Sequence, residues 1–123
     1  MQLILIALGG ALGSVCRYWM STAVQRFASP FFPYGTFAVN FLGCLIFGII
    51  VGAARQRFVL GPPERAFLLI GVLGGFTTFS TFTYETFALL QDGELLRAFA
   101  NAAGQVVCGL VALWAGYAAV AAL

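Results

Sequence analysis

Long apolar runs alternate with short charged stretches along the whole of this sequence. The uncharged runs cover residues 1–16, 27–54, 66–84 and 98–123. A helix that crosses the hydrocarbon core of a bilayer needs about 20 mostly apolar residues, within a range of about 17–25. The pattern therefore predicts an all-α integral membrane protein with transmembrane helices over residues 2–24, 34–54, 64–91 and 97–122.

Residues typical of aqueous loops separate these predicted helices. They are Pro30 and Pro33, then the pair Pro62-Pro63, and finally the turn Asp92-Gly93-Glu94. Pro and Gly are the strongest markers of turns. We therefore predict that residues 1–123 form a single four-helix transmembrane domain. No basic residue precedes the first apolar run, so we expect a retained span there rather than a cleaved signal peptide.

Composition supports this fold class and excludes several others. Hydrophobic residues make up 62% of the chain and charged residues 8%, whereas a soluble domain carries about 25% charged residues. The sequence contains no His, which excludes a His general base, a His-ligated metal and a Ser-His or Cys-His pair. We therefore expect that the protein is not an enzyme. The formal net charge of +2 is too small to indicate nucleic-acid binding.

Small residues within the apolar runs indicate close helix packing. Glycines spaced as GxxxG occur at Gly9/Gly13, Gly48/Gly52 and Gly71/Gly75. Such pairs let helix backbones approach one another within a bilayer. The cysteines, at Cys16, Cys44 and Cys108, are odd in number and dispersed. They do not form the pattern of a disulfide framework or a zinc site, so we expect them to be small packing residues.

The arginines give almost no signal for orientation in the membrane. Four spans place both termini and the central loop on one side, which then carries Arg55, Arg57 and Arg65. The other side carries Arg26 and Arg97, together with Arg17 if that side chain extends outwards. Orientation depends on an excess of basic residues on one side, so this balance predicts insertion in both orientations. Two oppositely inserted copies would form an antiparallel, dual-topology homodimer, the arrangement that larger transporters build from inverted repeats.

The third predicted span contains an unusual stretch over residues 74–82. Two glycines are followed by Phe76-Thr77-Thr78-Phe79-Ser80-Thr81-Phe82, in which hydroxyl residues alternate with phenylalanines. A broken helix persists in hydrocarbon only where it is buried in protein or lines a wet cavity, and unwound carbonyls in transporters commonly coordinate cations. The alternative is a kinked packing helix whose hydroxyls bond back to carbonyls one turn earlier.

Other polar residues lie within the spans. Asn40 is central in the second span and either links two helices or donates hydrogen bonds to an anion. Arg17 either extends to the headgroups or attracts anions at a vestibule, and Glu85 is either a mouth residue or half of an ion pair. On the fourth span, Asn101, Gln105 and Cys108 fall on one helical face, which faces either a pore or a partner helix.

Three motifs, in order along the chain, resemble those of the Fluc/CrcB fluoride channels. The first is residues 9–13 followed by Arg17-Tyr18, and the second is Gly35-Thr36 followed by Asn40 and Gly43. The third, residues 74–82, is long and specific. Chain length and number of spans agree as well, whereas the fourth span matches mainly by its hydrophobicity.

The resemblance implies a dual-topology homodimer in a cell (inner or plasma) membrane, with two fluoride pathways and a central sodium ion. Phe79 and Phe82 would be the pathway phenylalanines, and Asn40 a pore-lining donor. The backbone carbonyls of Gly74 and Thr77 from both subunits would hold the sodium, and Arg17 would lie near a vestibule. We expect the Ser80 and Thr81 hydroxyls to act in the fluoride pathway and Glu85 to lie at its mouth. Passive export of fluoride from the cytoplasm follows from the resemblance alone.

Two rival functions differ in the residues they require. A small dual-topology multidrug or cation exporter also has four spans and is dimeric, but it needs an acidic residue buried in its first helix. The first span here contains Arg17 and no acidic residue. A scaffold protein that transports nothing would have no use for the interrupted stretch over residues 74–82. The sequence therefore favours a channel.

Overall fold

The computed structural model describes residues 1–56 and 59–123, and within them every regular element is a helix, with no strand. Single helices form the first, second and fourth spans: α1 (Gln2–Arg26), α2 (Tyr34–Gln56) and α6 (Leu95–Ala121). The third span has several pieces: α3 (Pro62–Arg65), the π-helical η1 (Ala66–Leu73), α4 (Gly74–Phe76) and α5 (Phe79–Gln91). In this part of the chain, 4 spans are long and apolar enough to cross a membrane, which confirms the predicted all-α membrane fold.

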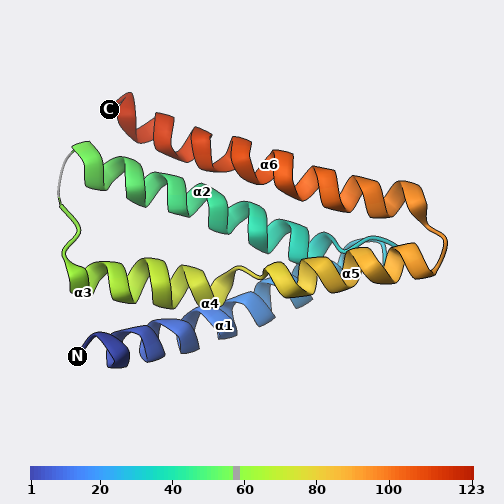
Figure 1. The fold of residues 1–123 in the computed structure, drawn as a ribbon, viewed down its shortest axis with the longest axis horizontal. Coiled ribbons are helices and arrows are strands. Elements are labelled where there is room, and N and C mark those ends of the chain that lie inside the picture. The colour runs from blue at the N-terminus through green and yellow to red at the C-terminus, as the bar shows by residue number, and fades with distance from the viewer. Residues whose placement is uncertain (57–58) are drawn as a thin grey trace.

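The spans run back and forth along one bundle (Figure 1). Both termini, the end of α2 and the start of α3 lie at one end, and the α5–α6 turn lies at the other. α2 packs along α6, and α1 packs along η1 and α4. Arg55 and Arg65 are therefore at the end with the termini, and Arg26 and Arg97 at the opposite end. Arg57, which the topology prediction also used, lies outside the described residues.

Several helices extend slightly beyond their predicted limits. α1 continues to Arg26, α2 continues to Gln56, and α6 starts at Leu95. Charged and polar residues can continue a helix into the headgroup region, where the length of an apolar run sets no limit. Pro62 and Pro63 form the first turn of α3 instead of preceding it. Pro fits there because its missing N–H has no helical acceptor at that position.

Glycines explain how closely these helices approach. A methyl group on Gly9 would lie 2.5 Å from a backbone carbonyl oxygen of η1, and one on Gly13 would lie 2.8 Å from the backbone nitrogen of Phe76. On α2, a methyl group on Gly48 would lie 3.0 Å from the backbone nitrogen of Tyr117. These separations leave almost no room for a Cβ atom, so the GxxxG glycines do lie at helix–helix contacts.

This packing predicts opposite outcomes for two glycines on α1. Gly13→Ala should destabilise the fold by about 1–3 kcal/mol, because the new methyl group must push α4 away from α1. Gly10→Ala is the matched control, since a methyl group there would meet no atom within 4 Å. Thermal unfolding of the purified proteins in one detergent measures the difference. Equal stability of the two variants would contradict the close contact at Gly13.

Candidate functional site

The third span is interrupted near its middle by two residues with extended backbone. Thr77 has φ −83° and ψ 157°, and Thr78 has φ −149° and ψ 115°. Thr78 then caps α5, because its hydroxyl oxygen accepts a hydrogen bond of 3.3 Å from the backbone N–H of Thr81. Threonine is stiff at χ1, favours extended backbone and is a good N-cap residue. The adjacent threonines therefore explain where the helix stops and where it restarts, and the predicted broken third helix is present.

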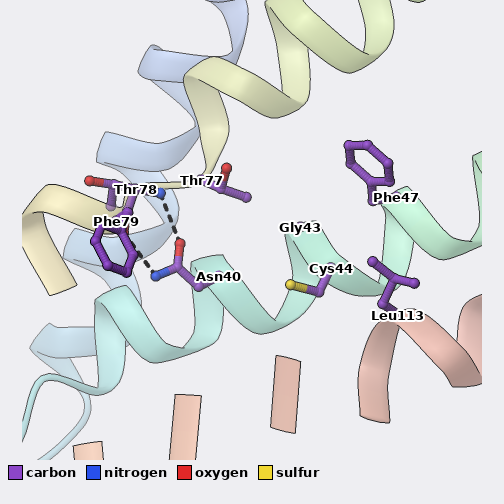
Figure 2. Close-up of a pocket in the computed structure, with 8 residues that line it drawn as sticks. All are labelled: Asn40, Gly43, Cys44, Phe47, Thr77, Thr78, Phe79 and Leu113. Carbon is purple, nitrogen blue, oxygen red and sulfur yellow. Dashed lines mark hydrogen bonds between the residues drawn. The ribbon is translucent and has the colours of Figure 1, made fainter. Parts of the chain in front are cut away.

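The side-chain amide of Asn40 holds this break from α2. Its Oδ1 accepts from the backbone N–H of Thr78 at 2.9 Å, and its Nδ2 donates to the carbonyl of Thr78 at 3.0 Å. Figure 2 shows the amide pointing at Thr78 with the ring of Phe79 beside it. The same Nδ2 donates to Oε1 of Gln105 at 2.8 Å. Both N–H groups of Asn40 are therefore engaged, and the amide links three helical segments.

The break changes the partners of two backbone carbonyls. In a continuous helix the N–H of Thr78 would donate to the carbonyl of Gly74, but here it donates to Asn40. The carbonyl of Gly74 thus loses its helical partner, and Gly74 is exposed. The carbonyl of Thr77 accepts a hydrogen bond of 3.4 Å from Nη1 of Arg17. Arg17 is half-buried and turned towards the break, so it does not extend to the headgroups.

A hollow of about 300 Å³ opens beside the break. Asn40, Thr78 and Phe79 line one part of it, and Phe47 and Leu113 lie at the other end (Figure 2). Its walls thus combine a polar group from the break with large apolar side chains. The hollow is open to the outside of the single chain.

Phe79 and Phe82 lie together at the start of α5. Their ring centroids are 5.7 Å apart and the rings are tilted by 52°. Phe79 is 77% exposed, and the neighbouring Ser80 and Thr81 are exposed as well. Phe76 is instead 7% exposed, because it precedes the break and packs inside the bundle. The structure therefore places four predicted pathway residues in the first turn of α5, with Phe79 at the hollow beside the break and Thr81 at a separate hollow beside α1, and it separates Phe76 from them.

Glu85 lies further along α5, one turn beyond Phe82. Its Oε1 accepts from the hydroxyl of Thr36 at 2.8 Å. Its Oε2 is buried and, among the described residues, has no hydrogen-bond partner. Glu85 also lines a hollow of about 490 Å³ together with Arg26. Glu85 thus lines a cavity, and its hydrogen-bond partner is Thr36.

The sequence model of the family described as "CrcB-like protein, Camphor Resistance (CrcB)" matches residues 4–117. The chain belongs to the CrcB family. It is 48% identical over 115 residues to the "Fluoride-specific ion channel FluC" of Nitratidesulfovibrio vulgaris. The aligned region covers 94% of this chain and 93% of the relative. It is 49% identical over 116 residues to the protein of that name from Geotalea daltonii, with 94% of each chain covered. The relative from Geobacter sulfurreducens is 48% identical over 111 residues, 90% of each chain.

Membership of the CrcB family and 4 apolar spans in the described residues identify a multi-pass membrane protein. The family match reaches all four spans and includes the break and most of α6. The break, Asn40 and the exposed start of α5 therefore lie within the region that this chain shares with its CrcB relatives.

The first helix of this CrcB chain, α1, has a polar face that its apolar sequence pattern did not predict. Ser14, Arg17 and Ser21 on α1 line a hollow of about 240 Å³ with Thr78 and Thr81. An adjoining hollow of about 490 Å³ continues along α1 and is lined by Ser21, Gln25 and Arg26. The signal was present, because positions 14, 17, 21 and 25 recur at helical spacing. The small hydroxyl side chains of the first span were counted there only as part of an apolar run.

Proposed function

We propose that this chain forms a fluoride-selective channel that lets fluoride leave the cytoplasm passively. The observation that carries this proposal is the break at Thr77 and Thr78, which brings amide, hydroxyl and phenyl groups to the middle of a membrane span. Irregular backbone at that depth is stable only where it is buried in protein or lines a cavity. The relatives of this chain that are named fluoride-specific channels support the choice of ion.

The side chains at the start of α5 suit a small, hard and strongly hydrated anion. The hydroxyls of Ser80 and Thr81 can replace water as donors. Phenyl ring edges carry the positive part of the ring quadrupole, so Phe79 and Phe82 can contact the ion weakly without trapping it. Conduction requires sites that admit an ion and also release it. Asn40 lines the hollow beside the break together with Phe79. Both N–H groups of Asn40 are hydrogen-bonded, so either one would meet the ion only by leaving its present partner.

We propose the polar face of α1 as the vestibule that leads to this pathway. Arg17 and Arg26 lie at successive hollows along α1 and would raise the local concentration of anions. Glu85 lies at the edge of the same region. Its hydrogen bond with Thr36 joins α5 to α2 at this hollow and holds one carboxylate oxygen in place.

We propose an antiparallel, dual-topology homodimer as the functional unit. Polar groups at the middle of the membrane are costly when they face lipid, and Gly74, Ser80 and Thr81 are exposed in the single chain. A second copy would cover them and close the open hollow beside the break. The near balance of arginines at the two ends of the bundle supports oppositely inserted copies.

We also propose that the carbonyls of Gly74 and Thr77 from both copies hold a structural sodium ion. Carbonyl oxygens at a helix break are suitable ligands for such a cation, and the carbonyl of Gly74 has lost its helical donor. The carbonyl of Thr77 carries a long contact to Arg17, at 3.4 Å, which a cation would displace. The ion would supply positive charge where carbonyl dipoles of the two copies face one another.

Growth in fluoride tests the proposed export from cells. A bacterial strain that lacks its own fluoride exporter should tolerate fluoride when this chain is expressed in its inner membrane. It should also accumulate less intracellular fluoride, measured with an ion-selective electrode after lysis. Unchanged tolerance and unchanged accumulation, with the protein present in the membrane fraction, would contradict export.

The dual topology predicts two populations of the chain, one with both ends in the cytoplasm and one with both ends outside it. A reporter fused to the C-terminus should give signal in the cytoplasm and outside it, since an excess of only one arginine gives little bias to either orientation. Adding two or three Lys residues at that terminus should bias insertion and reduce the number of functional dimers. Co-expression with an oppositely biased copy is the control that should restore them. A signal confined to the cytoplasm would show that insertion has a single orientation.

A further inference from the structure

A continuous chain of side-chain hydrogen bonds crosses the bundle behind the break. Nδ2 of Asn40 donates to Oε1 of Gln105 at 2.8 Å, and Nε2 of Gln105 donates to Oδ1 of Asn101 at 2.9 Å. Nδ2 of Asn101 donates to the hydroxyl of Thr86 at 2.9 Å, which in turn donates to the carbonyl of Phe82 at 2.8 Å. We call Asn40, Gln105, Asn101 and Thr86 the amide chain.

The amide chain has one sense of donation, fixed by backbone groups at its two ends. At one end the N–H of Thr78 can only donate, so it requires Oδ1 of Asn40. At the other end the carbonyl of Phe82 can only accept, so the hydroxyl of Thr86 donates to it and accepts from Asn101. Rotating any one amide by half a turn would exchange its oxygen and nitrogen. Two oxygens or two N–H groups would then face each other in place of a hydrogen bond.

Burial makes that exchange unfavourable. Asn101 is 0% exposed, and Gln105, Asn40 and Thr86 are half-buried. An unpaired donor or acceptor in an apolar interior carries a large desolvation penalty. A buried network whose members are all paired is correspondingly rigid. Each member therefore holds the orientation of the next one.

The two ends of the amide chain enclose the first turn of α5. Thr78 precedes that turn and Phe82 ends it, so the residues between them are Phe79, Ser80 and Thr81. We propose that Thr86, Asn101 and Gln105 are positioning residues, which hold the amide of Asn40 in one orientation and thereby fix the break and the pathway residues that follow it. This rests on the proposed fluoride conduction. The amide chain also shows what the polar face of the fourth span contacts. Asn101 bonds to α5 and Gln105 bonds to α2.

Thr86 offers the sharpest test because Thr83, about one helical turn earlier on α5, is a matched control. Thr86→Val removes the hydroxyl that Asn101 needs and should lower fluoride efflux from liposomes about tenfold, which corresponds to about 1.4 kcal/mol on the barrier. Thr86→Ser keeps a hydroxyl and should restore efflux to within about twofold of the parent. Thr83→Val is the control. Its hydroxyl makes the same bond one turn back, to the carbonyl of Phe79 at 3.0 Å, but it is exposed and lies outside the amide chain.

A spectroscopic readout separates positioning from a general loss of packing. Asn40 and Asn101 are the two asparagines in the sequence, so labelling with ¹⁵N-asparagine gives side-chain amide signals from the amide chain alone. Thr86→Val should shift the signals of both residues, although Asn40 does not touch Thr86. Thr86→Ser and Thr83→Val should leave the signal of Asn40 in place. Gln105→Leu removes the middle link and should shift both signals if Thr86→Val fails to fold.

Measuring both fluoride efflux and the asparagine signals distinguishes failure of this inference from failure of the proposed function. A parent protein that releases no fluoride overturns the proposed function, and the asparagine signals still test the amide chain. A conducting parent whose Thr86→Val variant matches Thr83→Val in flux overturns the positioning role. Reduced flux in Thr86→Val with an unmoved Asn40 signal overturns it as well, because the loss would not pass through the amide of Asn40.

Discussion

Replacing Asn40 by Asp should reduce fluoride efflux about a hundredfold or more, which corresponds to about 2.7 kcal/mol on the barrier. In the parent, Nδ2 of Asn40 donates to the carbonyl of Thr78 at 3.0 Å and to Oε1 of Gln105 at 2.8 Å. An aspartate would place an oxygen opposite both of these acceptors. It would also bring a negative charge into the membrane interior, where a charged side chain costs about 2.5–3.5 kcal/mol on insertion scales.

Asn40→Ser is the matched control for this substitution. Serine adds no charge, and its hydroxyl can both donate and accept, so we expect a reduction of roughly tenfold, or about 1.4 kcal/mol. Efflux of fluoride from liposomes measures both variants, and gel filtration tests whether each assembles as the proposed dimer. Normal fluoride efflux in Asn40→Asp would show that Asn40 is only a structural link, with no bearing on the pathway.

Replacing Phe79 or Phe82 by Ile should lower fluoride efflux at least about tenfold. Isoleucine keeps much of the apolar volume but has no ring quadrupole, so it offers no positive edge to an anion. The rings lie 5.7 Å apart at the open start of α5, directly after the break. If they act through their edges, either substitution alone should weaken contact with the ion while larger anions stay excluded.

Flux must be compared in variants that still form dimers, because Phe79 lies on the surface that we expect a second copy to cover. Helix packing in the single chain relies on the glycines of α1 and α2, so we expect both Ile variants to fold. Phe→Tyr at the same positions keeps a ring and alters its rim, which tests the role of the edge separately. Flux within about twofold of the parent in both Ile variants would show that bulk alone is sufficient.

The sequence was enough to predict the spans and the break. An apolar run of membrane length leaves little choice but a helix, and the stretch over residues 74–82 favoured an interruption. The exact position was less predictable, because Gly74 and Gly75 are still helical and the break falls at Thr77 and Thr78. Helix ends were less predictable, because α1 and α2 continue past their apolar residues. Pro62 and Pro63 were read as loop residues although proline also suits the first turn of a helix.

The contacts around the break could not be predicted, because they depend on which helix faces which. Composition left Asn40 open as a link or a donor, and the structure shows it bonded to both Thr78 and Gln105. The direction of Arg17 depended equally on the neighbouring span, whose Thr77 carbonyl it meets. Asn101 and Gln105 were recognised as one face of a helix, but only the packing of α6 against α2 and α5 shows what that face contacts.

Fluoride efflux from liposomes that contain the purified parent protein tests the proposed channel most directly. Vesicles loaded with potassium fluoride or potassium chloride are compared after a potassium ionophore allows charge to balance, with ion-selective electrodes as the readout. We expect rapid release of fluoride and negligible release of chloride, without any need for a proton gradient. Equal release of both anions, no release of fluoride, or transport only of an organic cation against protons would contradict a fluoride-selective channel.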